Sequence, residues 1–569
     1  MNNIIKDKER TFTMSNCGGG LLNLCSYGTS NILVYGNPEK SVFFKTYKSI
    51  TNFGIQRFRL DAKTPSTPSI TDSITMEYVL DRNAEMVGDC YLVVNLPDVY
   101  SPIYKYRTGG GSNVYYAPEF RWIDELGVNI IREVEVQSGG QTISRYTGEY
   151  FSILAHRDNR HKLDLWKQMV GHVDELTNPK KECVEIYDNI YKYPNALYDT
   201  DLEQISGNIE PSIRGRKLYV PLDMWFTRKI SDALPLVATQ YAPITIRIQL
   251  RPLKEWYVVR EKPDLLNEEY VKGVYMSPDS STYEHQPHRF FNPPQSEPMA
   301  PKGQTDEMHR DIKLNWKSDI HVMATYYFLS EEERGIMANR VYKRLIRDVY
   351  NHTLTDIVGP TQRRVYSSGL VSSYTFRFRR NDSDKRNEWS NYTNQSRYNY
   401  VNKCFSYLPE EEGLSAFESD LYHSGGLENE NQKKILKTFN IVVDGIEREN
   451  TMDAGIVEYV ETYARSAFLT KQGVYEYNFT CDTNTRNYQP GGGMNMDKFG
   501  EVMFHIDTIT PPLKDVPDDD NICNDLFEIV GSRKRNANLY QYTYEMEVFE
   551  ERYNTLTIRS GNIGLLFAR

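Results

Sequence analysis

The chain has 569 residues and a formal net charge of −10, from 67 Lys and Arg against 77 Asp and Glu. This length exceeds one ordinary core and predicts two large domains, and the acidic balance argues against a protein that neutralises many phosphates. No run approaches the roughly 18 to 20 apolar residues that span a membrane, and the N-terminus has no apolar signal region. We therefore expect a soluble chain without a cleaved export signal, whose partners are proteins.

Aromatic residues make up 12% of the chain, which favours strands. Residues 1–17 are polar with little periodicity and predict a loosely attached arm, or an arm that docks on a neighbour. From Ser41 onward the pattern is typical of successive strands separated by turns. The strands predicted first are residues 42–48, 53–60, 74–80 and 91–96, followed by a hairpin over 133–145 that reverses at Gly139 and Gly140.

The stretch 212–252 shows the clearest strand signal. Ile244, Ile246, Ile248 and Leu250 alternate with polar residues, as a strand with one face on a core requires. Such alternation favours an antiparallel sheet, because parallel strands read as continuous apolar runs. The same region predicts a strand at 216–220 and a short amphipathic helix at 223–230, and helices are expected earlier, at 149–156 and 162–170.

The second half repeats the strand-rich pattern after a proline-rich stretch. Ser330 and Glu333 form a capping box that predicts a helix, with Met337, Val341 and, further on, Leu345 and Val349 on one face. The polar stretch 381–432 predicts a long exposed insertion. Strands are predicted at residues 319–328, 374–379, 439–443, 474–480, 502–506 and 540–548. Two halves of many short strands indicate an all-β protein with minor helices, built as two antiparallel sandwiches or barrels.

Several blocks resemble the major capsid proteins of nucleocytoplasmic large DNA viruses, the mimivirus-like branch most of all. The blocks begin with GGGLLNLCSYGTSNILVYGNPEKSVFFKTYKSITNF (18–53) and include FRWIDELG, VEVQSGGQTISRYTGEY, GRKLYVPLDMWFTRKISDALPLVATQY, RNEWSNYTN and ERYNTLTIRSGNIGLLFAR, in the family's order. The resemblance thus runs from Gly18 to Arg569, and residues 1–17 precede it.

The resemblance implies two tandem eight-stranded antiparallel jelly rolls, a double jelly roll. With the proline-rich stretch 261–313 as the interdomain connection, the chain divides into an arm at 1–17, a first jelly roll at 18–260 and a second jelly roll at 314–569. The resemblance further implies a homotrimeric, pseudo-hexagonal capsomer that contacts neighbouring capsomers and minor capsid and penton proteins. The shell would be assembled in the host cytoplasm over an internal membrane, without membrane insertion or direct contact with nucleic acid.

The sequence predicts no catalytic, cofactor-binding or metal site. His285 and His288 lie three apart in a proline-rich stretch where a helix is not expected, and the seven cysteines are dispersed like free thiols in a reducing compartment. The triple glycines at 109–111 and 491–493 lack the P-loop lysine and predict flexible loop tips. The acidic runs at 331–333, 410–412 and 518–520 are typical of helix starts or solvated loops rather than of a glycosidase pair.

Two basic runs and five sequons complete the candidates. Residues 376–380 alternate Phe with Arg, which suits either single-stranded nucleic acid or a strand with phenylalanines inward and arginines on a protein interface, and the acidic net charge favours the second. Residues 533–535 indicate an exposed basic loop. The sequons are Asn351, Asn381, Asn391, Asn394 and Asn478, for which secretory glycosylation is not expected.

The predicted function is therefore a structural capsid protein without enzymatic activity. Two alternatives stay open: a scaffold of immature particles with the same fold, and a carbohydrate-binding or carbohydrate-active β-sandwich.

Overall fold

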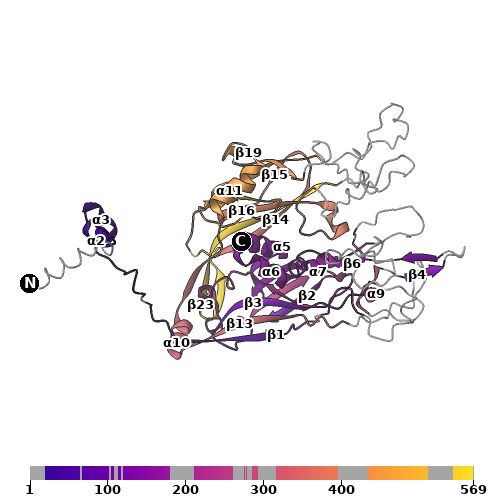
Figure 1. The fold of residues 1–569 in the computed structure, drawn as a ribbon, viewed down its shortest axis with the longest axis horizontal. Coiled ribbons are helices and arrows are strands. Elements are labelled where there is room, and N and C mark those ends of the chain that lie inside the picture. Colours follow the sequence, from indigo (N-terminus) through magenta and orange to yellow (C-terminus); the bar gives the residue numbers. More distant parts are fainter. Residues whose placement is uncertain are drawn as a thin grey trace, which may run out of the picture. The chain divides into compact units, whose positions relative to one another are not determined.

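The computed structural model describes residues 19–45, 47–64, 67–101, 104–107, 113–116, 119–179, 210–260, 275, 277–278, 285–292, 316–394, 433–468, 470–487, 489–510 and 542–567. The chain divides into two compact units, Met1–Asn52 and Phe53–Arg569. Figure 1 shows that antiparallel strands dominate the second unit, with a few helices among them. Within the described residues, no helix is both long and apolar enough to cross a bilayer.

The described part of the first unit, residues 19–52, holds the short helices α2 (Leu21–Cys25) and α3 (Thr29–Tyr35). No residue of either helix is buried, and Leu33 and Phe43 are 92% and 98% exposed. The strand predicted at 42–48 is wrong, because a strand needs a neighbour to pair its backbone and the described residues there pair with none. The strands of the first jelly roll therefore begin at Phe53 instead of following directly from residue 18.

Two antiparallel sheets form the first jelly roll. In order of pairing, one sheet contains β1 (Phe53–Leu60), β13 (His321–Leu329) and β3 (Met86–Asn95). Strand β3 also pairs with two short strands, β9 (Lys217–Pro221) and β10 (Leu234–Pro235). The other sheet contains β2 (Ile74–Val79), β11 (Ile244–Leu250), β7 (Ile131–Ser138) and β8 (Gln141–Tyr146). Two smaller ladders pair β4 (Tyr104–Arg107) with β5 (Asn113–Tyr116) and β6 (Glu119–Trp122) with β12 (Tyr257–Arg260). The alternation from Ile244 to Leu250 is confirmed, since its apolar residues are buried.

Turns and helices connect these strands. The predicted hairpin is β7–β8, which reverses at Gly139 and Gly140, both at positive φ as a tight reversal requires. Thr147 caps α5 (Gly148–Asp158) by accepting a hydrogen bond from the Tyr150 amide. The helix predicted at 223–230 is a single turn instead. The other helices of this half are α4 (Leu126–Asn129), α6 (Leu163–Val170), α7 (Asp174–Thr177) and α9 (Pro287–Phe291), with 3₁₀ turns at Arg160–Lys162, Ile230–Asp232, Leu236–Ala238 and Leu253–Glu255.

The second jelly roll also has two antiparallel sheets. One contains β14 (Tyr342–Ile357), β23 (Tyr544–Arg559), β16 (Leu370–Arg380) and β20 (Val474–Asn478), with β21 (Met494–Asn495) and β24 (Asn562–Leu565) beside β16 and β23; the other contains β15 (Pro360–Arg364), β22 (Val502–Thr508), β17 (Leu436–Val443) and β18 (Ile446–Glu447), with β19 (Met452–Asp453) beside β17. The helical elements are α10 (Glu331–Asn339), a π-helical turn (Ile456–Val460), α11 (Glu461–Arg465) and 3₁₀ turns at Asn381–Arg386 and Met496–Lys498.

Strand order repeats between the halves. In each, the first strand pairs with a strand at or next to the end, as β1 does with β13 and β14 with β23, which only the short β24 follows. That late strand then pairs with the third strand of its half. The facing sheets correspond as well, β2-β11-β7-β8 matching β15-β22-β17-β18. The sequence shows no visible residue-level repeat, so the duplication survives in topology alone. The predicted double jelly roll is the fold.

Strand β13 belongs to the first jelly roll. It pairs along its length with β1, from Leu329 opposite Phe53 to Val322 opposite Leu60, and on its other side with β3. The range 314–569, predicted for the second jelly roll, would assign this strand to the wrong sheet. Strand periodicity alone shows that a strand exists and does not reveal its partner, which here lies about 260 residues earlier.

Helix α10 follows β13 and precedes β14 in the chain, and it is shorter than predicted. Ser330 caps it, its hydroxyl accepting a hydrogen bond from the Glu333 amide at 3.4 Å, so the predicted start is confirmed. The helix ends at Asn339, and Leu345 and Val349 lie in β14 instead. A spacing of four fits a strand face as well as a helix face, and β pairing with β23 decides between them.

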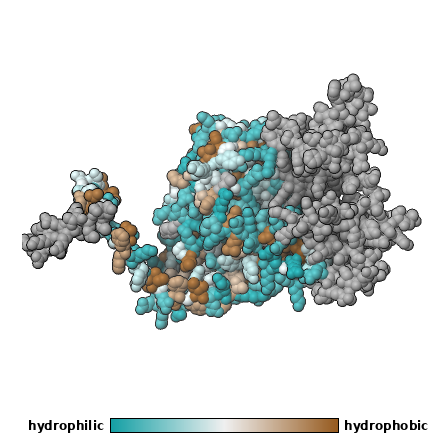
Figure 2. Space-filling model, in the orientation of Figure 1, coloured by the Kyte–Doolittle hydropathy of each residue, from teal (hydrophilic) through white to brown (hydrophobic). Residues whose placement is uncertain are grey.

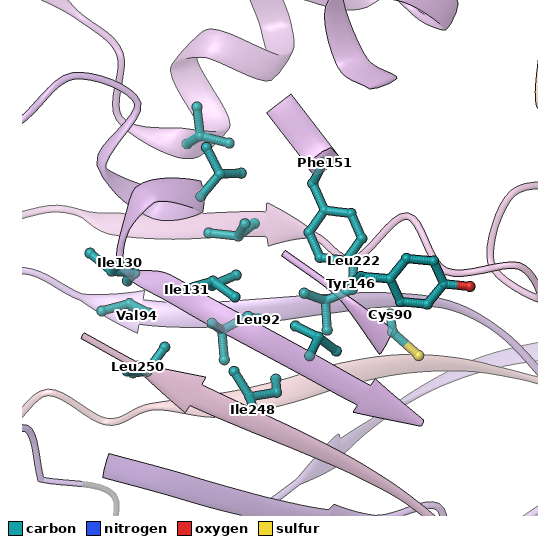
Figure 3. Packing of buried hydrophobic residues seen from close by; sticks show 14 of the residues in the cluster. Cys90, Leu92, Val94, Ile130, Ile131, Tyr146, Phe151, Leu222, Ile248 and Leu250 are labelled. Carbon is teal, nitrogen blue, oxygen red and sulfur yellow. The ribbon is translucent and has the colours of Figure 1, made fainter. Parts of the chain in front are cut away.

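Apolar side chains fill both jelly rolls. In the first, Leu92 and Val94 of β3 and Ile248 and Leu250 of β11 meet between the two sheets (Figure 3). This cluster continues into the second half through residues such as Phe549 of β23. A separate cluster lies between the sheets of the second jelly roll and includes Phe376, Phe378, Phe439, Phe504, Tyr475 and Val548. The sheet β14-β23-β16-β20 thus has apolar contacts on both faces.

Candidate functional site

Charged side chains are buried where α5 of the first jelly roll meets the sheet β14-β23-β16-β20. We call them the interdomain charge network: Glu125, Glu149, Arg157 and Asp158 from the first half, and Arg377, Arg379, Lys471, Glu476, Glu547 and Glu551 from the second. Each of these side chains is at most 13% exposed. Buried charges are rare in proteins unless they are paired, and most of these pairs cross between the halves.

Arg157, near the end of α5, has a fully buried side chain. Its Nη2 lies 2.7 Å from Glu551 Oε1 and its Nε lies 2.9 Å from Asp158 Oδ1. Its Nη1 donates to Thr375 Oγ1 at 3.2 Å and lies 3.8 Å from Glu476 Oε1. One guanidinium from the first jelly roll therefore contacts the three adjacent strands β16, β20 and β23 of the second.

Glu149, in the first turn of α5, makes the reverse pairing. Arg377 Nε donates to its Oε2 at 2.8 Å, and Arg379 Nη1 donates to its Oε1 at 2.7 Å. Arg377 also pairs with Glu547, and Arg379 Nη2 lies 3.3 Å from Glu545 Oε2. Burial alone would raise the pKa of Glu149, but Arg377, Arg379 and Arg251 outweigh it and lower that pKa to about 2. Glu149 is therefore ionised at neutral pH.

A third link joins Glu125 to Lys471. The Lys471 ammonium pairs with Glu125 Oε2, which also accepts a hydrogen bond from Ser152 Oγ at 2.6 Å. Burial would raise the pKa of Glu125, yet the Lys471 ammonium, together with the hydrogen bond from Ser152, lowers it to about 2. His156 itself is neutral, because burial, with Lys471 next, lowers its pKa to about 4. The charge on this link is thus carried by one carboxylate and one ammonium.

Two carboxyl groups of the network titrate near neutrality. Burial raises the pKa of Glu476 to about 7 despite Arg157 nearby, and burial likewise raises the pKa of Glu547 to about 7, against the attraction of Arg377. Glu547 shares Arg377 with Glu149, and the pKa values of the two carboxyl groups move in opposite directions, that of Glu149 down and that of Glu547 up. The network therefore holds fewer negative charges than carboxyl groups at neutral pH.

Replacing Glu476 with glutamine is expected to flatten the dependence of stability on pH between about 4.5 and 8. The folded chain holds a proton on Glu476 up to about pH 7, whereas an unfolded glutamate releases it near its ordinary pKa of 4.5. Stability from this group therefore falls as pH rises through that window. Glutamine mimics the protonated acid, so its advantage should grow from near zero at pH 4.5 to about 3 kcal/mol at pH 8.

Chemical denaturation of wild type and Glu476→Gln across this pH range measures the difference. Glu210→Gln is the matched control, because the Glu210 side chain is 63% exposed, and it should follow wild type at every pH. A constant difference between Glu476→Gln and wild type from pH 4.5 to 8 would contradict the raised pKa.

The alternating Phe and Arg residues at 376–380, in β16, were the sequence feature that pointed to part of this network. Phe376 and Phe378 lie in the core of the second jelly roll, while Arg377 and Arg379 point to the opposite face and pair with Glu149. Their burial leaves them unavailable to nucleic acid, and the protein-interface interpretation of the pattern holds, with the interface inside one chain. No comparable sequence signal marks Arg157 or Glu551, because single charged residues in a helix or strand are ordinarily exposed.

The remaining candidates do not gather into a site. His288 lies in α9, so the expectation that no helix forms there is wrong: Pro287 occupies its first position, where proline is favoured. The acidic residues 331–333 form the first turn of α10. Gly491 packs closely instead of forming a loose tip, since a Cβ there would lie 2.3 Å from Thr480 Oγ1. Residues 109–111, 410–412, 518–520 and 533–535 lie outside the described residues.

Among the described residues, no three or more His, Cys, Asp or Glu side chains come together in a way that could hold an ion. What the described geometry offers instead is a rigid joint: reciprocal buried ion pairs with apolar contacts around them fix one jelly roll against the other.

Solved structures share this double jelly roll. PBCV-1 VP54 matches with a TM-score of 0.56 at 16% sequence identity, covering 93% of this chain and 100% of that one. The Faustovirus major capsid protein matches with a TM-score of 0.57 at 11% identity, covering 94% of both chains. The fold class is therefore the double jelly roll found in viral capsid proteins.

Sequence relatives narrow this class. Residues 41–275 match the family described as the N-terminus of the major capsid protein. The major capsid protein of Chrysochromulina ericina virus is 29% identical over 260 residues, which cover 42% of this chain and 42% of that protein. Capsid protein 1 of Acanthamoeba polyphaga mimivirus is 27% identical over 245 residues, which cover 43% of this chain and 36% of that protein.

A longer match extends over both halves. The major capsid protein of Paramecium bursaria Chlorella virus 1 is 21% identical over 556 residues, which cover 97% of this chain and 99% of that protein. The first two relatives are thus matched over less than half of their length, and this third one over nearly all of it. The resemblance seen in the sequence is confirmed: the chain is similar to the major capsid proteins of large DNA viruses.

Proposed function

We propose that this chain is the major structural protein of an icosahedral capsid of a large DNA virus. Three copies would form a pseudo-hexagonal capsomer, because two jelly rolls per chain place six barrels in a ring. The observation that carries this proposal is the repeated strand order of the two halves, held by the interdomain charge network. Two similar barrels in one rigid chain are what a sixfold outline built from three copies requires.

Ring closure also has a physical advantage. Exposed edges of antiparallel sheets invite uncontrolled pairing, and a closed cyclic arrangement buries surface without leaving a free heterologous face within the ring. The partners would be neighbouring capsomers together with minor capsid and penton proteins, and the site of assembly would be the host cytoplasm. This role is structural and needs no catalytic residue.

Composition of purified virus particles separates this proposal from its rival. A capsid protein should be a dominant component of mature virions, in a copy number set by the shell area. A scaffold protein with the same fold should be abundant in immature particles and depleted from mature ones, and that result would overturn the assignment to the mature capsid.

The arm of residues 19–52 is a second candidate assembly element. Its large apolar side chains are exposed, including Leu24, Leu33, Val42, Phe43 and Tyr47. Figure 2 shows brown, hydrophobic residues along this segment. Exposed large apolar side chains gathered on one segment are typical of an interaction site. We infer that a neighbouring copy covers this arm in the assembled shell. The expectation that residues 1–17 act in assembly falls outside the described residues and stays a prediction.

Deleting residues 1–52 is expected to leave the melting temperature within about 2 °C of wild type, because the strands and cores of the second unit begin at Phe53. The same deletion should weaken association between chains. In light scattering, the assembly of the shortened chain should then dissociate on dilution at a higher protein concentration than the wild-type assembly does. Differential scanning calorimetry checks the first part. A fall of many degrees would show that the arm belongs to a core.

A further inference from the structure

A small cavity lies between the two jelly rolls, beside the interdomain charge network. Its volume is about 40 Å³, and it is lined by Trp225 and Arg228 from the first half and by Arg347, Arg486 and Tyr553 from the second, among others. A water molecule needs roughly 10 to 15 Å³ of such volume, so the space suits a few waters or one small ion, not a nucleotide.

Three residues that line this cavity carry buried nitrogen donors without a hydrogen-bond partner among the described residues. These donors are Trp225 Nε1, Arg228 Nε, Arg228 Nη2 and Arg486 Nε. Arg228 is the strongest case. Its side chain is only 3% exposed, and its Nη1 donates to the Arg347 carbonyl oxygen at 3.3 Å, but its Nε and Nη2 have no acceptor, which is costly for a buried guanidinium. These donors therefore need an acceptor that the described residues do not provide.

The nearby carboxyl groups do not meet this requirement. Asp223 approaches Arg228 Nε and Arg486 Nη2 only to 3.9 Å in each case, beyond hydrogen-bond distance. Burial raises the pKa of Asp223, and it raises the pKa of Asp348, on the neighbouring strand β14, to about 7. Arg347 also lies beside the cavity and adds its positive charge there. Its Nη1 donates to the Thr483 carbonyl oxygen at 2.6 Å and its Nη2 donates to the Tyr553 hydroxyl at 2.7 Å. Four arginines line the cavity, Arg228, Arg344, Arg347 and Arg486, against one carboxyl group, that of Asp232, so positive charge prevails there.

We propose that this cavity binds one small tetrahedral oxyanion of the phosphate class, held by Arg228, Arg486 and the Trp225 indole N–H. Guanidinium groups match the oxygens of such an anion with paired, charge-assisted hydrogen bonds. Since the ligands come from both jelly rolls, the anion binds the joined state and stabilises it. This inference concerns the single chain and does not depend on the capsid role.

Thermal unfolding of the full-length protein in phosphate tests the proposal. At a phosphate concentration about 100 times Kd, the melting temperature should rise by about 2 to 3 °C above that in chloride of equal ionic strength. Isothermal titration calorimetry with inorganic phosphate should give one site per chain.

Three variants sharpen the test. Arg486→Met should lose most of the phosphate-specific rise while folding normally, because the Arg486 side chain is one-third exposed. Arg228→Met should lose it as well. The control Arg214→Met, at a side chain 80% exposed, should keep the full rise. Equal melting temperatures in phosphate and chloride, or an undiminished rise in both Arg486→Met and Arg228→Met, would overturn the proposal.

Discussion

Replacing Arg157 with methionine is expected to lower the free energy of unfolding by about 3 to 5 kcal/mol. The substitution removes the guanidinium that contacts Asp158, Glu551 and Glu476 together. Glu551 keeps only a more distant arginine, Arg347, whose Nη1 lies 3.6 Å from its Oε2. Uncompensated carboxylates in a dry interior are expensive, whereas the volume lost is small. Urea denaturation measures the loss.

Two further variants isolate the electrostatic cause. Arg214→Met removes an exposed pair with Glu210 and should cost less than about 1 kcal/mol. The double variant Arg157→Met, Glu551→Gln should recover part of the loss, because it removes the stranded charge together with its partner. If Arg157→Met alone changes stability no more than Arg214→Met, the network does not join the halves.

Replacing Gly148 with alanine is the second change with a large expected effect. A Cβ at this position would lie 1.9 Å from the Val128 carbonyl oxygen and 2.6 Å from that of Ile131, and both are backbone atoms that cannot rotate away. Gly148 is the first residue of α5, so relief of the clash would shift the helix that carries Glu149 and Arg157. We expect a loss of about 3 kcal/mol or more.

Gly335→Ala provides the matched control. Gly335 lies inside α10, and a Cβ there would meet nothing within 4 Å, so alanine should raise stability by about 0.5 to 1 kcal/mol. A Gly148→Ala protein as stable as wild type would mean that α5 can move freely, which is incompatible with a rigid joint.

The positions of the strands were the part of the fold that the sequence predicted best. Strand β11 alternates apolar and polar residues over its whole length, β16 does so from Tyr374 to Arg379 and β22 from Phe504 to Asp507, and a period of two follows directly from the pleat. Pairing partners carry no such local signal, which is why β13 was predicted to lie in the second jelly roll although it closes the first. The strand predicted at 42–48 shows the converse, since its aromatic and β-branched residues suit a strand but find no pairing neighbour.

The interdomain charge network was visible in part. Arg377 and Arg379 stand out because they alternate with phenylalanines, and the pattern predicts that they share one face. Their partner Glu149 lies more than 200 residues away in a helix, and nothing in its neighbourhood marks it as buried. Long-range pairs between single charged residues become evident only when the fold places them together.

Light scattering coupled to size-exclusion chromatography tests the central claim most directly, because the capsomer model fixes one mass. The proposal predicts a homotrimer of about 199 kDa, three times the chain mass of 66.3 kDa, that persists on dilution. A monomer or dimer whose mass does not change with concentration would contradict it.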